Sequence, residues 1–333
     1  MTLTKDDDTP LERAYVREES RRRKARAALL PIRQITPVIT EKQLAKLKPP
    51  FRIKQCFLTP DVGPNEIEPN VVYKDDKQVK FLLLPKVISE AAWLKAHIAA
   101  TDSRTDSRMT KGTREADAQV YGRKLTLGWL PQLPGHSKRS RYYNIRTAQT
   151  LEQPGLVAAF YPLLREMDAL VDMNVPDYYD YAWRWAMRAI RPDVRDPATR
   201  LLVDEDDLTR IADPRGYQVV KNIDPWDMTY TIRGTAFSTV EFNYNIVFKA
   251  HADGNNVKGT CVCITTLGSY AGGRLVFPRY GYSAELEPRD LLLCDNNKEL
   301  HGNLGPIVGE RYSVVAFLHE RVMYAGYVRA FSP

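Results

Sequence analysis

The chain has 333 residues, 44% of them hydrophobic and 27% charged, which excludes a disordered or fibrous protein and fits an ordinary globular one. It contains no run of about eighteen apolar residues, and its charged first residues are unlike the apolar core of a signal peptide. We therefore expect an intracellular protein that does not enter a membrane. It would lie in the nucleus of a eukaryote, or in the cytoplasm if it is bacterial or viral.

The four cysteines show no Cys-x-x-Cys spacing, which argues against a structural zinc site. Cys261 and Cys263 are two residues apart and should share one face of a strand. We interpret all four as reduced thiols in the core: Cys56, Cys261, Cys263 and Cys294.

The first hundred residues predict a charged arm, an irregular wrap, a strand and a helix. Residues 9–12 (Thr-Pro-Leu-Glu) have the pattern of a helix N-terminus, so residues 1–30 are expected to form a charged, solvated helical arm. The proline-rich segment 31–69 should wrap irregularly around the core. Residues 78–84 predict a strand, and residues 89–100 predict an amphipathic helix.

Residues 101–146 are rich in Ser, Thr and Gly, show little periodicity and are expected to form a long loop. Residues 103–146 hold ten Lys or Arg against three acidic residues, a local excess of seven that equals the net charge of the whole chain, +7. Basic residues interleaved with hydroxyl and aromatic side chains suit phosphate contacts and base stacking, although a solvated loop has the same composition. The residues expected to contact phosphate are Arg123, Lys124, Lys138, Arg139 and Arg141.

Two helices and then a series of strands are expected in the second half. Apolar residues at helical spacing predict a helix over 153–173, and the Tyr and Trp residues of a second helix over 177–190 should pack against a sheet. Residues 191–216 are charged and loop-like, with a short helix at 205–212. From about residue 217 the pattern changes to strands.

Short strands separated by glycine or proline turns predict a barrel or sandwich of the jelly-roll type. The expected strands include residues 260–265, 274–277, 284–286 and 290–294. The turn signals between them are Gly268, residues 271–273, residues 279–281 and residues 287–289.

A metal-ligating pattern accompanies these strands. His251 and Asp253 are two residues apart, so their side chains leave one face of a strand, and His301 follows about fifty residues later. Two histidines and one carboxylate bind Fe(II) and leave coordination positions open for an oxidant and a cosubstrate. Arg311, downstream on another strand, is placed to form a bidentate pair with the distal carboxylate of 2-oxoglutarate. An isolated His-x-Asp triplet is weak, but the strand context favours an Fe(II)/2-oxoglutarate dioxygenase.

The same region resembles the TET/JBP family of Fe(II)/2-oxoglutarate oxygenases, which hydroxylate the methyl group of 5-methylcytosine or thymine in DNA. The similarity covers about residues 240–320. The four scattered cysteines cannot supply the cysteine-rich zinc region of the vertebrate members, and the short distance from His301 to Arg311 resembles that of the compact microbial members. The motifs that carry it are residues 251–263, residues 268–275, residues 288–293, His301 and residues 311–319.

The resemblance implies a base pocket as well as a metal site. Asn256, five residues after His251, matches a residue that hydrogen-bonds the flipped base. His319, eight residues after Arg311, matches a base-contacting histidine, and Phe317 matches an aromatic that stacks on the base. Phe317 and His319 should share a strand face, although a core phenylalanine and a turn-closing histidine would have the same spacing. The amide of Asn256 can donate or accept, so cytosine and thymine are not separated by it.

The predicted fold class is α+β, with a double-stranded β-helix (jelly-roll or cupin-like) core buttressed by N-terminal helices. The predicted organisation is an arm over 1–30 and a single dioxygenase domain over 31–333, in which a helical and basic-loop part (31–216) precedes the β-helix core (217–333). We expect a monomer that uses Fe(II), 2-oxoglutarate and O2 to oxidise 5-methylcytosine in DNA to 5-hydroxymethylcytosine and further. The alternatives are a thymine or N6-methyladenine oxygenase on DNA, a protein prolyl or side-chain hydroxylase, and a DNA-binding module that has lost its chemistry.

Overall fold

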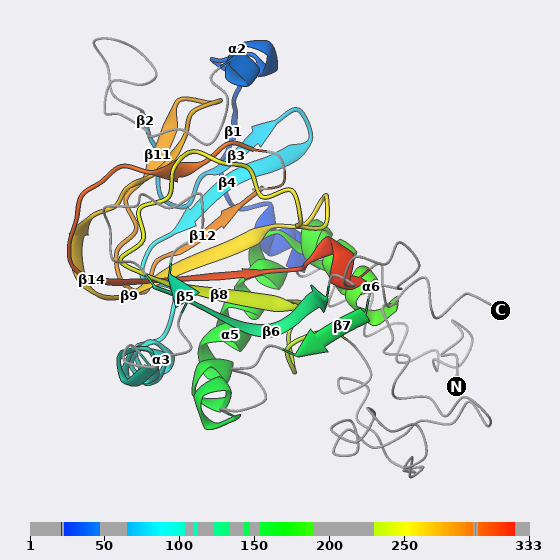
Figure 1. Cartoon of the computed structure of the whole chain (residues 1–333). Helices are drawn as coiled ribbons and strands as arrows, with labels where there is room; N and C mark the ends of the chain where they lie inside the picture. Colours follow the sequence, from blue (N-terminus) through cyan, green and yellow to red (C-terminus); the bar gives the residue numbers. More distant parts are fainter. Residues whose placement is uncertain are drawn as a thin grey trace, which may run out of the picture.

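The computed structural model describes residues 21, 23–46, 65–103, 110–111, 123–132, 143–146, 154–188, 230–295, 297 and 299–323. Two β-sheets form the centre, and helices lie along the outside of the larger one (Figure 1). Along the larger sheet the strands are β1 (Ile32–Gln34), β3 (Val72–Asp75), β4 (Gln78–Leu84), β12 (Leu291–Cys294), β9 (Val262–Gly272), β14 (Ile307–Phe317), β8 (Thr239–Tyr244), β6 (Arg123–Gln132) and β5 (Thr110–Lys111), and β7 (Tyr143–Arg146) pairs with β6. The smaller sheet has the order β13 (Gly302–Asn303), β10 (Leu275–Phe277), β11 (Tyr282–Ala284) and β2 (Asn65–Glu66).

Strand β14 separates the core from the cavity described below. It pairs antiparallel with β8 on one side and β9 on the other. Because successive side chains of a strand point to opposite faces, the even-numbered residues of β14 face the helices and the odd-numbered ones face the cavity. The helix-facing residues are Tyr312, Val314 and Ala316, and the cavity-facing ones are Arg311, Ser313 and Val315.

Helices α3 (Glu90–Ser103) and α5 (Pro154–Asn174) pack against each other and cover the outer face of the larger sheet (Figure 1). The hydroxyl of Ser89 accepts a hydrogen bond from the Ala92 amide (3.3 Å), so a side chain caps the N-terminus of α3. Phe160 of α5 is fully buried, and its ring centroid lies 4.1 Å from that of Phe242 on β8. Burial of such a side chain stabilises the fold by about 1.5–3 kcal/mol.

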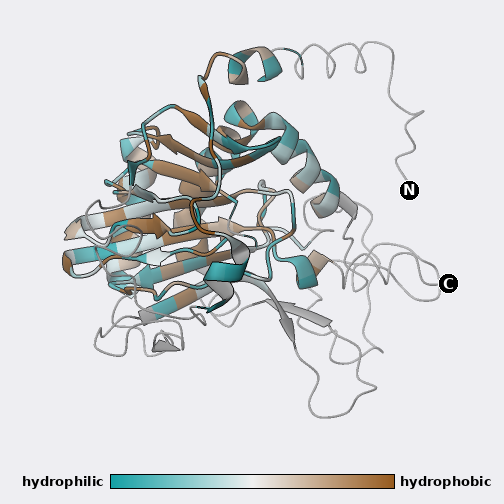
Figure 2. Cartoon of the chain, turned by 90° about the horizontal axis from the view of Figure 1, so that it is seen from above, coloured by the Kyte–Doolittle hydropathy of each residue, from teal (hydrophilic) through white to brown (hydrophobic). Residues whose placement is uncertain are grey.

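A second buried cluster fills the space between the two sheets. Phe81 of β4 and Phe277 of β10 have ring centroids 4.3 Å apart, and Tyr280 meets Phe81 edge-on. The hydrophobic segments gather in the middle of the strands, as Figure 2 shows. This cluster holds the smaller sheet against the larger one and leaves the cavity at one end of the sandwich.

Helix α6 (Pro176–Arg188) joins the sheet through its aromatic residues, as the sequence predicts. The Val79 amide of β4 donates a hydrogen bond to the Tyr178 hydroxyl at 2.7 Å. Trp183 and Trp185 pack against a third cluster that contains Trp129 and Leu318. The short helix α2 (Glu41–Lys46) lies apart from these layers (Figure 1).

The expected strand over 78–84 and the expected helices over 89–100, 153–173 and 177–190 are confirmed as β4, α3, α5 and α6. The expectation of a continuous loop over 101–146 is wrong in the described part, because β5, β6 and β7 lie there. In β6 the buried residues Leu125, Leu127 and Trp129 alternate with Lys124 and Thr126, and β6 pairs with β8. The alternation covers only a few residues of a segment that is otherwise basic and polar, so the composition of the whole segment indicates a loop.

The turn expected at Gly268 is also wrong. Gly268 lies inside β9 and pairs with Arg311 of β14, whereas the turn comes later, at Gly272 and Gly273. With a φ of +100°, Gly268 has a conformation that L-residues rarely adopt, and a Cβ there would lie far inside van der Waals contact with the Glu310 carbonyl oxygen. The absence of a side chain at Gly268 therefore allows β9 and β14 to approach each other closely.

The N-terminal segments are partly described. Arg23 forms an ion pair with Asp172 of α5, and Lys24 lies 3.0 Å from Asp177 of α6, so two ion pairs connect this part of the arm to the helices while most of its described residues are exposed. The predicted wrap over 31–69 contributes the short elements β1, α2 and β2. The predictions on residues 9–12, Cys56 and 205–212 lie outside the described residues.

The other three cysteines, Cys261, Cys263 and Cys294, are buried free thiols, in agreement with the interpretation as core residues. Within the described ranges, none of the helices is long and apolar enough to span a membrane.

Candidate active site

Residues from two segments that are far apart in the sequence meet at one end of the sandwich. His251 and His301 form an isolated antiparallel bridge in which each backbone amide donates to the other residue's carbonyl, both at 2.9 Å. Their ring centroids lie 4.5 Å apart. Asp253 joins them, and the candidate ligand atoms of the three residues lie within 4.8 Å of one another. The structure therefore brings together the triad that the sequence predicts.

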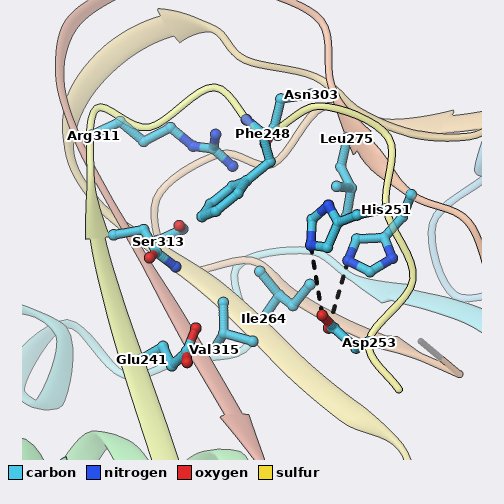
Figure 3. Close-up of a pocket in the computed structure, with 12 residues that line it drawn as sticks. Glu241, Phe248, His251, Asp253, Ile264, Leu275, Asn303, Arg311, Ser313 and Val315 are labelled. Atoms are coloured by element: carbon cyan, nitrogen blue, oxygen red, sulfur yellow. Dashed lines mark hydrogen bonds and ion pairs between the residues drawn. The ribbon is translucent and has the colours of Figure 1, made fainter. Parts of the chain in front are cut away.

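The two histidine rings are oriented by backbone carbonyls. The Nδ1 of His251 lies 2.7 Å from the Lys249 carbonyl oxygen, and the Nδ1 of His301 lies 3.0 Å from that of Glu299. Since a carbonyl can only accept, Nδ1 carries the proton in the neutral ring and the lone pair is on Nε2. Both Nε2 atoms face Asp253, at 3.5 Å from Oδ1 for His251 and 3.6 Å from Oδ2 for His301 (Figure 3).

The electrostatics of the triad suit a divalent cation. Burial raises the pKa of Asp253, but the neighbouring His301 and His251 outweigh it and hold the pKa below its usual value. Burial lowers the pKa of His301, so the ring stays neutral. One ionised carboxylate and two neutral imidazoles, whose candidate ligand atoms converge and which line the cavity, fit Fe(II).

A small, partly open cavity lies beside the triad. Arg311 lies at the end opposite Asp253 (Figure 3). Its guanidinium is 5.5 Å from the Tyr270 ring centroid, and its side chain is buried with the charged end toward the cavity. The lining residues are Glu241, Asn243, Phe248, His251, Asp253, Ile264, Leu275, His301, Asn303, Arg311, Ser313 and Val315.

Several of these polar residues carry no signal in the sequence that separates them from ordinary strand residues. Ser313 follows Arg311 by two positions, so the strand period alone could have placed it on the same wall. Asn243 is the cross-strand partner of Ser313, and this pairing of β8 with β14 is not visible from spacing. Glu241 lies two residues before Asn243 on β8, is the cross-strand partner of Val315, and forms an ion pair with Lys124 of β6.

The residues predicted for the base pocket also come together. Asn256 and His319 form an isolated bridge, and the Val257 amide donates to the Leu318 carbonyl at 3.0 Å. Both side chains are buried, and neither Asn256 Nδ2 nor His319 Nδ1 has a hydrogen-bond partner among the described residues. Burial lowers the pKa of His319 to about 4, so its ring is neutral at physiological pH.

Phe317 lies beside His319, with ring centroids 6.1 Å apart, but it is buried against the cluster between the sheets. The structure gives less support to the residues predicted to contact phosphate than to those of the base pocket. The Lys124 ammonium is paired with Glu241, and Arg123 begins β6 with a side chain outside the described part. Lys138, Arg139 and Arg141 lie outside the described residues.

The protein is a two-sheet jelly roll, and one end of it holds two histidines, one aspartate and a buried arginine. This combination is typical of the Fe(II)/2-oxoglutarate oxygenases. The comparison with protein families agrees. The model of the TET/JBP family, the oxygenase domain of the 2-oxoglutarate and Fe(II)-dependent dioxygenase superfamily, matches residues 133–320. The chain belongs to this family, and its cofactors are Fe(II) and 2-oxoglutarate.

Among solved structures, the chain is similar to NgTET1 in complex with 5mC DNA, with a TM-score of 0.50, 11% identity and coverage of 92% of this chain and 90% of that one. It is also similar to a prolyl hydroxylase from Trichoplax adhaerens (TM-score 0.38, 10% identity, 74% and 86% coverage) and to OsALKBH1 (TM-score 0.36, 10% identity, 77% and 100% coverage). No curated protein sequence matches. The likeness to NgTET1 confirms the predicted double-stranded β-helix fold.

Proposed function

We propose that this protein oxidises the methyl group of 5-methylcytosine in DNA to 5-hydroxymethylcytosine and to more oxidised products. The observation that carries the proposal is the pair of buried polar atoms on Asn256 and His319, which have no partner among the described residues. Burying an unsatisfied polar group costs about 1–3 kcal/mol, so such a pair is expected where a ligand completes the hydrogen bonds.

The position of this pair relative to the cavity supports a base as the ligand. Arg311, Ser313 and Val315 line the cavity, and Phe317 follows them on the same face of β14. From Arg311 to Phe317 the strand rises about 20 Å, and His319 comes directly after it. One strand thus serves the cosubstrate at one end and a flipped base at the other, beside the metal triad.

Each residue has a role in this proposal. His251, Asp253 and His301 would hold Fe(II), and Arg311 would pair with the distal carboxylate of 2-oxoglutarate. When bound, Fe(II) and 2-oxoglutarate would allow O2 to react: O2 is the oxidant, 2-oxoglutarate gives up two electrons as it is decarboxylated to succinate and carbon dioxide, and one oxygen atom enters succinate while the other enters the substrate C–H bond. Ser313 and Asn243 line the same wall and can hydrogen-bond the carboxylate that Arg311 pairs with.

The substrate base would be positioned by the remaining three residues. Phe317 offers a ring for stacking, and Asn256 and His319 offer polar atoms to the edge of the base. A neutral His319 ring can either donate or accept, as can the Asn256 amide. A base within a duplex does not reach such a pocket, so the target nucleotide must be extruded.

The similarity to NgTET1 in complex with 5mC DNA and the basic segment 103–146 both favour DNA as the macromolecular partner. We assign the phosphate contacts to Arg123, Lys138, Arg139 and Arg141, and not to Lys124, whose ammonium is paired with Glu241. Neutralised phosphates release counterions, so DNA affinity should fall steeply as the salt concentration rises.

The test uses the purified chain with Fe(II), 2-oxoglutarate and O2 on matched duplexes that differ in one base: 5-methylcytosine, thymine or N6-methyladenine. Mass spectrometry of the digested nucleosides should show oxidation of 5-methylcytosine, and Asp253→Ala should abolish it. Oxidation of only thymine or N6-methyladenine would move the assignment to that base. Succinate release that a proline-containing peptide stimulates, with no oxidation of any duplex, would replace the proposal with a protein hydroxylase.

A further inference from the structure

The chain between β12 and His301 is fixed at both ends by one buried lysine. Lys80 projects from β4, and its ammonium lies 3.0 Å from Asp295 Oδ2, at the end of β12, and 3.2 Å from Glu299 Oε1, two residues before His301. Lys80 and Glu299 are only 5% and 4% exposed. The attraction between buried opposite charges is weakly screened, so this ammonium ties the two ends of the segment together.

Two residues from the turn between β10 and β11 hold the same carboxylate. Arg279 Nη1 lies 2.9 Å from Glu299 Oε1, and the Tyr280 hydroxyl lies 3.4 Å from that oxygen while donating to Asp75 at 2.8 Å. The two cations, Lys80 and Arg279, balance the two anions, Asp295 and Glu299, as a buried cluster requires. The carboxylate of Glu299 is thus anchored from both sheets.

The same residue orients a member of the triad. The Glu299 carbonyl accepts the hydrogen bond from His301 Nδ1 at 3.0 Å, so Glu299 sets which way the His301 ring faces. Groups that hydrogen-bond a ligating histidine fix its tautomer and direction, and their loss weakens metal binding. The side chain of Glu299 is held by Lys80 of β4, and its backbone carbonyl orients the ring of His301. Glu299 therefore connects β4 to the triad.

We propose that Glu299 is a positioning residue for His301 and that Lys80 and Arg279 act through it. Lys80 lies outside the part that matches the family model, residues 133–320, so a strand beyond that region contributes to metal affinity. The inference rests on the proposed role of His301 as a metal ligand. It does not depend on DNA or on which base is oxidised.

The experiment is a titration of the full-length protein with Co(II), followed by calorimetry and by the visible Co(II) absorption, which reports the ligand geometry. Glu299→Gln keeps the shape of the side chain, and Lys80→Met removes the ammonium. We expect each to weaken Co(II) binding by about 10- to 100-fold and to change the spectrum. Lys80→Arg should restore most of the affinity, and the double variant should lose little more than the weaker single variant because the residues act as one unit.

Lys86→Met is the matched control, since that lysine forms an exposed ion pair with Glu287 just beyond β4 and should leave Co(II) binding unchanged. A folded Glu299→Gln variant with wild-type affinity and spectrum would overturn the inference. So would failure of both variants to fold in the cold, judged by circular dichroism, because the cluster would then support the whole barrel. If His301→Ala bound Co(II) like the wild type, the proposed metal site itself would be wrong, which is a different result.

Discussion

Gly268 allows a sharp test of how closely β9 and β14 approach at the cavity. Replacement by alanine places a Cβ against the Glu310 carbonyl oxygen, in a residue whose φ is +100°. The unfavourable backbone conformation costs about 1–2 kcal/mol, and the shift needed to relieve the contact costs about 1–3 kcal/mol. We therefore expect Gly268→Ala to lower the free energy of unfolding by about 2–5 kcal/mol.

For a domain of this size, each kcal/mol corresponds to about 2 °C, so the midpoint of thermal unfolding should fall by about 4–10 °C. Differential scanning calorimetry of the protein without ligands measures it. Gly155→Ala is the control, because Gly155 lies in α5 with nothing near its added Cβ, and alanine there should be neutral or stabilising by up to about 1 kcal/mol. A Gly268→Ala midpoint within error of the wild type would refute the close approach.

The same substitution has a functional consequence. Gly268 is the cross-strand partner of Arg311, so a displaced backbone moves the guanidinium that we assign to 2-oxoglutarate. The KM for 2-oxoglutarate should rise in Gly268→Ala, while the KM for DNA stays close to the wild-type value. An increase confined to the KM for DNA would contradict this assignment of the two ends of β14.

Three further predictions concern the site. Asp253→Ala should abolish metal binding and turnover without unfolding the chain, as measured by Fe(II) titration under argon and by circular dichroism; retained turnover would exclude Asp253 as a ligand. Asn256→Ala should lower kcat/KM for 5-methylcytosine DNA by about 10-fold or more, because the amide hydrogen bond to the base is lost, and equal loss of DNA-independent succinate release would argue against a base contact. The pKa of His319 falls to about 4 in the folded protein against about 6.5 when unfolded, so the folded state binds fewer protons and stability is lost as the pH falls from about 6.5 to about 4. Urea unfolding across that range should show a shallower pH dependence for His319→Gln, and an unchanged slope would show that the ring is not buried as described.

Local spacing predicted much of the metal site and of the secondary structure. His251 and Asp253 are two residues apart, which is enough to put both side chains on one face, and the short continuous apolar run in residues 291–294 is enough to predict β12. Helix α5 has apolar residues at helical spacing over its whole length, so it was predicted within a residue of its bounds. Short-range periodicity decides such features, and the sequence displays it directly.

Other features depend on which strands are neighbours. The pairing of β8 with β14 puts Asn243 beside Ser313, and the pairing of β6 with β8 turns a segment that reads as a basic loop into part of the larger sheet. A glycine in a sequence indicates a turn as readily as a close approach of two strands, so the role of Gly268 inside β9 follows only from the pairing of β9 with β14.

The sequence by itself predicted the class of chemistry, because two histidines, a carboxylate and an arginine follow one another in the order that suits an Fe(II)/2-oxoglutarate oxygenase. The tertiary structure decided how that chemistry is held. The Lys80 ammonium meets the Glu299 carboxylate across more than two hundred residues of chain, and Asn256 meets His319 across more than sixty. Contacts between residues so far apart arise from the packing of whole strands, which no local pattern encodes.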